Sequence, residues 1–97
     1  MKETAMEHYM VVKFNNGVDA KKLYGEIADL FAQASQIEGV RKAEVFLSSF
    51  RLKNRCDLMI RVRMKKSALK DFESSSIYQI WEKKYLPLTD EVTVFDS

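Results

Sequence analysis

Three consecutive serines at positions 74–76 stand directly before a run of large apolar and aromatic residues, "IYQIW". A nucleophilic serine needs a neighbouring base, but the chain has one histidine, His8, and no G-x-S-x-G turn. A phosphate-binding loop needs glycines, and this stretch has none. Ser76 precedes Gln79 by three positions, which is the spacing of a capping box at a helix start. The pattern therefore predicts that Ser76 caps a helix and is not a nucleophile.

His8 is the side chain best suited to proton transfer, because histidine is the residue type that exchanges protons near neutral pH. It begins a β-rich stretch, where it could line the mouth of a pocket or be a partly buried ring bonded to a backbone carbonyl. Both interpretations stay open. A metal site is not expected, because one histidine and one cysteine without close carboxylates are too few ligands. Cys56 has no nearby base in the sequence, and we interpret it as a structural thiol.

The length and composition predict a single globular domain over residues 1–97, with residues 1–6 flexible. At 46% hydrophobic and 31% charged residues, the composition is not that of a disordered chain. The net charge of +2 is too small to indicate nucleic acid or an anionic membrane. One cysteine excludes an internal disulfide, and no apolar run approaches the length that spans a bilayer. We therefore expect a cytoplasmic protein with no membrane partner.

The chain alternates between stretches typical of strands and stretches typical of helices. Apolar and polar residues alternate along "CDLMIRVRM", which makes it the clearest strand. Asp19 can cap the first helix, and Gly39 is the expected left-handed residue after it. The expected strands are residues 8–14, 40–50, 56–64 and 91–96. One helix is expected after Asp19 and a short one over residues 67–72, followed by a further helical piece that ends at 86.

The order β-α-β-β-α-β is typical of a ferredoxin-like α+β sandwich, in which two helices cover one face of a four-stranded antiparallel sheet. Alternation places His8 and Met10 on the helix-covered face, with Leu58. The opposite face is half apolar, and leaving it bare would expose a sizeable patch. Self-association into a two-fold homodimer through this open face is the economical arrangement. The residues expected at the dimer interface are Tyr9, Val11, Met59 and Phe95.

Basic residues on the open face raise the possibility that this face binds nucleic acid. Lys13, Arg61 and Arg63 lie on it near Tyr9, a layout similar to that of RNA-binding sheets with the same element order. The RNA-binding motif requires aromatic and glycine residues along the third strand, and "DLMIRVRM" has neither. We therefore expect no nucleic-acid partner.

Five segments together resemble the stress-responsive A/B barrel (Dabb) family, and they span residues 8–96. They are "HYMVVKF", "IEGVRKAEV", "CDLMIRVRM", "LKDFESSSIYQIW" and "LTDEVTVFD". No single segment is specific, and the resemblance lies in their order and spacing. It implies a ferredoxin-like fold and a homodimer whose two sheets pack face to face into an α+β barrel.

The resemblance also implies a candidate site. Some family members, similar to plant polyketide cyclases, use a tyrosine and a histidine in a segment like Y-x-x-H-P-x-H. Here the matching segment is "FESSSIY", so Phe72 stands at the tyrosine position and Tyr78 at the final histidine position. His8 is retained at a first-strand position that the family favours. The candidate catalytic pair is therefore His8 and Tyr78, although a phenol is a poor base at neutral pH and a better proton donor.

Two functions stay open. The first is a small dimeric protein of the stress-responsive A/B barrel type that binds an apolar small molecule between helices and sheet, without catalysis. The second is an enzyme that acts on a polyketide-like or aromatic molecule with His8 and Tyr78. Neither function requires a cofactor, and none is expected. The expected walls of the ligand pocket are Met10, Tyr24, Leu58 and Trp81.

Overall fold

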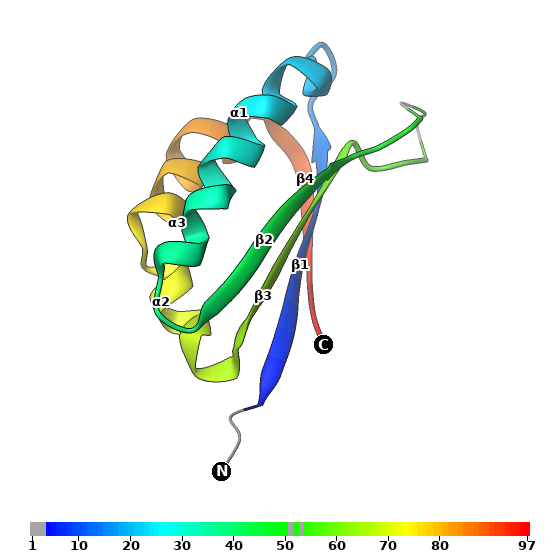
Figure 1. Cartoon of the computed structure of the whole chain (residues 1–97). Helices are drawn as coiled ribbons and strands as arrows, with labels where there is room; N and C mark the ends of the chain where they lie inside the picture. Colours follow the sequence, from blue (N-terminus) through cyan, green and yellow to red (C-terminus); the bar gives the residue numbers. More distant parts are fainter. Residues whose placement is uncertain (1–3, 51, 53) are drawn as a thin grey trace.

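The computed structural model describes residues 4–50, 52 and 54–97, and it confirms the ferredoxin-like α+β sandwich. Four antiparallel strands form one sheet in the order β2-β3-β1-β4, and the helices cover one of its faces (Figure 1). The elements are β1 (Ala5–Phe14), α1 (Ala20–Ala32), β2 (Val40–Leu47), β3 (Leu58–Lys65), α2 (Leu69–Glu73), α3 (Ser76–Ile80) and β4 (Thr89–Asp96). A π-helical turn, Trp81–Tyr85, follows α3 directly, and short 3-10 segments lie at Gln33–Gln36, Lys66–Ala68 and Leu86–Leu88.

Alternation along β1 and β3 fixes which side chains form the core. Met10 pairs with Ile60 and Val12 with Leu58, and all four are almost fully buried under the helices. Burying each such side chain contributes roughly 1.5–3 kcal/mol relative to leaving it in water. The residues between them face the opposite side and keep part of their surface exposed. The predicted division of the sheet into two faces is therefore confirmed.

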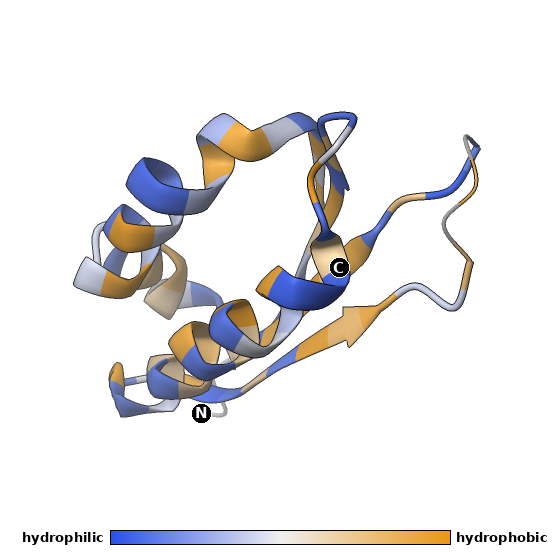
Figure 2. Cartoon of the chain, turned by 90° about the horizontal axis from the view of Figure 1, so that it is seen from above, coloured by the Kyte–Doolittle hydropathy of each residue, from blue (hydrophilic) through white to orange (hydrophobic). Residues whose placement is uncertain are grey.

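Contacts between aromatic side chains hold the helical segments of the covering layer together. The Phe31 ring of α1 lies 6.3 Å from the Phe72 ring of α2 and 5.8 Å from Trp81 in the π-helical turn, measured between ring centroids. All three rings are buried. Figure 2 shows the helices carrying hydrophobic and hydrophilic residues in alternation, as expected for segments with one side against a sheet.

Two helix starts test the predicted caps. The Asp19 carboxylate accepts hydrogen bonds from the Lys21 and Lys22 amides, so this predicted cap is confirmed. The second prediction was one residue too late. Ser75, not Ser76, is the cap of α3, and its Oγ accepts from the Tyr78 amide at 3.2 Å. The same hydroxyl donates to the Phe72 carbonyl at 2.6 Å, which ties the end of α2 to the start of α3.

Several predicted boundaries also change. The first strand begins at Ala5 rather than at 8, and Met6 is buried, while the expected flexibility of residues 1–6 stays a prediction. Residues 1–3 lie outside the described part of the chain. The second strand ends at Leu47 rather than at 50, and the third begins at Leu58 rather than at 56. No helix in the described residues combines the length and apolar character that crossing a bilayer requires.

Gly39 lies where β2 begins and approaches the 3-10 segment before α2. Its φ of +89° confirms the predicted left-handed conformation. A Cβ atom at this position would lie 2.8 Å from the Ala68 Cβ, closer than two carbon atoms can pack. Gly17 has nearly the same φ, +88°, with no atom within 4 Å of the position where a Cβ would lie.

Replacing Ser75 with alanine should lower the free energy of unfolding by about 1 kcal/mol, because it removes the acceptor for the first turn of α3. Ser76→Ala is the matched control, since Ser76 is exposed and makes no capping bond, and it should change stability by less than about 0.5 kcal/mol. Chemical denaturation followed by circular dichroism measures both. A larger loss for Ser76→Ala would contradict the assignment of the cap.

Gly39→Ala should destabilise the protein more than Gly17→Ala does. Both substitutions place alanine in a left-handed conformation, which costs roughly 1–2 kcal/mol. Only Gly39→Ala also forces a contact with Ala68, which adds on the order of 1 kcal/mol. Equal melting temperatures for the two variants would show that the segment before α2 moves away without cost.

Candidate functional site

The most unusual polar group of the core is the His8 side chain. His8 lies in β1 directly opposite Asp96 of β4, and the residue is 1% exposed. Nδ1 of the imidazole lies 2.5 Å from Oδ1 of Asp96. Paired residues of an antiparallel ladder point to the same face, which brings both side chains to the helix side of the sheet. The interpretation of His8 as bonded to a backbone carbonyl is therefore replaced by a bond to a carboxylate.

The second ring nitrogen of His8 has no partner. Nε2 is buried, and no described residue forms a hydrogen bond with it. The Phe72 ring packs against the imidazole edge to face, with 5.7 Å between centroids. A buried polar atom without a partner is rare in folded proteins, and it marks a position where a hydrogen-bonding group of another molecule would be favourable.

Tyr78 lies on the same side of the sheet as His8, but the two do not touch through their polar atoms. The Phe72 ring packs against both of them, with its centroid 5.7 Å from that of His8 and 5.4 Å from that of Tyr78. Burial of the half-buried phenol raises the pKa of Tyr78, and the nearby charges of Glu73 and Glu82 add to this effect. Tyr78 therefore stays protonated at neutral pH and is suited to donate a hydrogen bond, not to act as a base.

The four expected wall residues belong to the same apolar layer. Met10, Leu58 and Trp81 are buried in the core, and Tyr24 packs against it while partly exposed. Trp81 stacks on Tyr85, and the Tyr85 hydroxyl donates to Oε1 of Glu26 at 2.9 Å, which links the π-helical turn to α1. These side chains fill the space between the helices and the sheet, and their role as walls of a ligand pocket stays a prediction.

Hollows are found at the surface instead. One of about 460 Å³ is lined by Ala5, Met6, Glu7, Arg41, Lys42, Arg63 and Ser97, at the end of the sheet where β1 begins. Two smaller ones of about 200 and 120 Å³ lie where the segment between β2 and β3 meets Val11 of the open face. None of these three is lined by His8 or Tyr78.

The open face of the sheet carries the four residues expected at a dimer interface. Tyr9 pairs with Phe95 and Val11 pairs with Met59, so the four form two adjacent rows across the sheet. The Phe95 side chain is 61% exposed, and the neighbouring Phe46 is 40% exposed. An apolar band of this kind on a small domain is typical of a surface that is covered by a partner.

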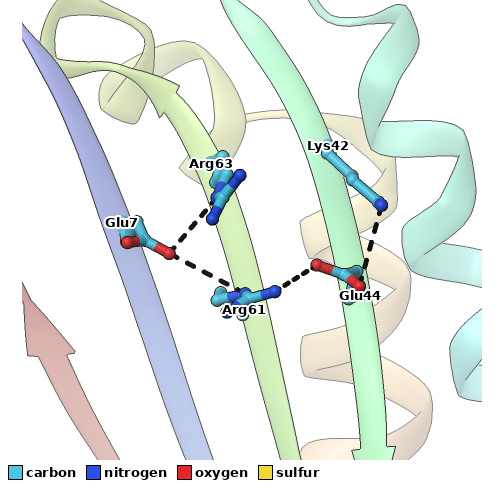
Figure 3. Close-up of polar contacts among 5 residues, drawn as sticks. All are labelled: Glu7, Lys42, Glu44, Arg61 and Arg63. Atoms are coloured by element: carbon cyan, nitrogen blue, oxygen red, sulfur yellow. Dashed lines mark hydrogen bonds and ion pairs between the residues drawn. The ribbon is translucent and has the colours of Figure 1, made fainter.

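Charged side chains continue the open face beyond this band (Figure 3). Arg61 of β3 bridges to Glu44 of β2 at 2.5 Å, and Arg63 lies 3.4 Å from Glu7 of β1. The hydrogen bond to Arg61 lowers the pKa of the Glu44 carboxyl and raises the pKa of the guanidinium. These ion pairs join three strands of the open face, and the expectation of no nucleic-acid partner stays a prediction.

Asp96 is the residue that the sequence analysis missed. The strand that contains it was predicted, but its partner depends on the pairing of two strands far apart in the chain. The available signal was parity, since a carboxylate on the helix side of a strand next to β1 would meet His8.

In the described part of the chain, no three His, Cys, Asp or Glu side chains gather into a group that could hold a metal ion.

Several solved structures share this fold at low sequence identity. A dimeric ferredoxin-like protein of unknown function from Thermobifida fusca matches with a TM-score of 0.81 and 7% identity, over 100% of this chain and 98% of that one. A second dimeric ferredoxin-like protein of unknown function, from Bacteroides fragilis, matches with a TM-score of 0.79 and 13% identity, over 99% and 98% of the two chains. The hydroxynitrile lyase from Passiflora edulis matches with a TM-score of 0.75 and 9% identity, over 99% and 94%.

No protein-family model and no curated protein matches the sequence. At these identities the structural matches establish the fold and nothing finer. The chain thus has the ferredoxin-like α+β fold of proteins that include dimers of unknown function and a hydroxynitrile lyase.

Proposed function

We propose that this chain is a homodimeric binding protein for a largely apolar small molecule, which contacts His8 on the helix side of the sheet. The observation that carries this proposal is the buried Nε2 atom of His8, which has no hydrogen-bond partner among the described residues. Leaving a polar atom in this state costs about 1–3 kcal/mol, and a ligand group that bonds to it would recover that cost.

The surroundings of His8 fit an apolar ligand. Phe72 packs on the ring, and Met10, Leu58 and Trp81 lie in the same buried layer. Sites for small molecules are mostly apolar with a few polar groups that fix orientation. His8 supplies one such group, and the protonated hydroxyl of Tyr78, whose ring also packs against Phe72, supplies a donor at a second position.

A ligand reaches His8 if the segment over it moves. That segment consists of two five-residue helices, α2 and α3, separated by Ser74 and Ser75 and followed by a π-helical turn. Short helices contribute few internal hydrogen bonds, and π-helical turns occur often at functional sites. Displacement of Phe72 with α2 would open the space between His8 and Tyr78 and leave Met10, Tyr24, Leu58 and Trp81 as its walls.

The dimer is part of the proposal because the open face carries exposed aromatic residues beside an internally paired charge network. Tyr9, Val11, Met59 and Phe95 would be covered by a second copy, and two matched proteins of this fold are described as dimeric. The resemblance to the stress-responsive A/B barrel family, with its face-to-face sheets, is consistent with this arrangement and stays a prediction.

A specific observation favours a second candidate function, acid–base catalysis on the bound molecule. The Asp96 carboxylate bonds to Nδ1 of His8, which is the way many enzymes orient a histidine base. Tyr78 would then serve as the proton donor. The hydroxynitrile lyase among the matched structures indicates that this fold can carry an enzyme.

Binding at His8 is tested with 2-naphthol, an apolar aromatic probe with one hydroxyl, by following backbone amide shifts in NMR spectra. We expect the largest shifts in β1, α2 and α3, and His8→Leu should weaken binding at least about fivefold because it removes the polar contact and keeps the apolar bulk. Arg41→Ala, beside the hollow of about 460 Å³, is the control and should bind normally. Shifts confined to that hollow or to the open face would refute the site. Turnover of polyketide-like substrates by the wild type but not by His8→Leu would favour the enzyme.

Dimer formation is tested by placing a charge in the apolar band. Val11→Asp should shift the protein toward the monomer by tenfold or more in dissociation constant, because it buries an unpaired carboxylate in the interface. Ile80→Asp changes an apolar residue of α3 that is 45% exposed, away from the open face, and should leave association unchanged. Sedimentation at micromolar concentration distinguishes the two states. A wild-type protein that sediments only as an 11.3 kDa species would exclude the dimer.

A further inference from the structure

We infer that Asp96 holds His8 in the tautomer with its proton on Nδ1, so that Nε2 is a hydrogen-bond acceptor and the ligand is a molecule that presents a hydroxyl group to it. This inference rests on the proposed function and names the class of ligand. It selects phenols and alcohols over ethers, aldehydes and ketones of the same shape, and it makes Asp96 a positioning residue.

The assignment of the first proton follows from the partner of Nδ1. An ionised carboxylate can only accept hydrogen bonds, so the contact between Nδ1 and Oδ1 of Asp96 requires a proton on Nδ1. The backbone holds this geometry, because the Glu7 amide donates to the Ser97 carbonyl and the Ser97 amide donates to the Glu7 carbonyl, at 3.1 and 3.0 Å. These two bonds flank the pair of His8 and Asp96 and keep the strands in register.

A neutral imidazole carries one ring proton. Because the contact with Asp96 places that proton on Nδ1, Nε2 of the neutral ring carries none. Asp96 therefore decides which nitrogen is bare, and the buried Nε2 lone pair has no donor among the described residues.

A bare nitrogen discriminates between ligands by the direction of their hydrogen bonds. A hydroxyl group donates to it, whereas a carbonyl or ether oxygen would place a second lone pair against the first. Sites that bond a substrate hydroxyl reject analogues that lack it, because the buried protein atom is then left without a partner. Phenol and anisole differ in this respect alone apart from one methyl group, and they make a suitable pair of probes.

His8 is the one histidine of the chain, so NMR of protein labelled with 15N-histidine reports this ring without ambiguity. At a pH where the ring is neutral, the wild type should show a protonated Nδ1 and a bare Nε2. Asp96→Ala should lose this preference and move the proton to Nε2, whereas Glu91→Ala, on the same strand but facing away from His8, should not. Phenol should shift the Nε2 resonance and bind about fivefold more tightly than anisole to the wild type. This preference for phenol should disappear in Asp96→Ala.

A proton on Nε2 of the neutral ring in the wild type would overturn the inference whatever ligand binds. A tautomer unchanged in Asp96→Ala would overturn the role of Asp96. Equal binding of phenol and anisole at His8 would overturn the ligand class. If the tautomer is as stated but neither phenol nor anisole shifts the ring, the positioning role stands, while the proposed binding function and the ligand class both fail.

Discussion

The pairing of β1 with both of its neighbours is the constraint on which the rest of the molecule depends. β1 lies in the middle of the sheet, with His8 opposite Val62 of β3 and opposite Asp96 of β4. Side chains alternate along a strand, so a slip of one residue would move His8 to the open face and Tyr9 into the core. The buried partners Met10 and Val12 prevent that slip, because each lost burial would cost about 1.5–3 kcal/mol.

This register gives the two faces different chemistry. On the helix side, His8 is the buried polar residue among those that the structure describes, and it pairs with Asp96. On the open side, Arg61 satisfies Glu44 and the lowered pKa of that carboxyl keeps it ionised, so the charges are matched within one chain. Self-matched charges beside an apolar band allow two identical faces to approach without like-charge repulsion, since neither face carries a large surplus. His8 and Tyr9, which are neighbours in β1, thus belong to the buried polar pair and to the exposed apolar rows, respectively.

The sequence was sufficient for the fold because its signals are local. The alternation in β3 and the polar turn residues around Gly17 each specify a structure within a few residues. The error at the start of α3 is also local, because Ser75 and Ser76 are equally able to accept from an amide three residues ahead, and only the turn that ends α2 decides between them. The partner of His8 was missed for a different reason. Strand pairing is set by the whole sheet, and no short pattern around Asp96 indicates which strand lies beside it.

The contact between His8 and Asp96 joins two residues that are 88 positions apart. Closing a loop of that length is entropically costly, and long-range strand pairs therefore form late relative to helices and hairpins. During synthesis, β1, α1, β2 and β3 can associate while β4 is still inside the ribosome, and until β4 docks the imidazole has no carboxylate on Nδ1. The position of the His8 proton is therefore set only after β4, the most C-terminal of the four strands, has docked beside β1.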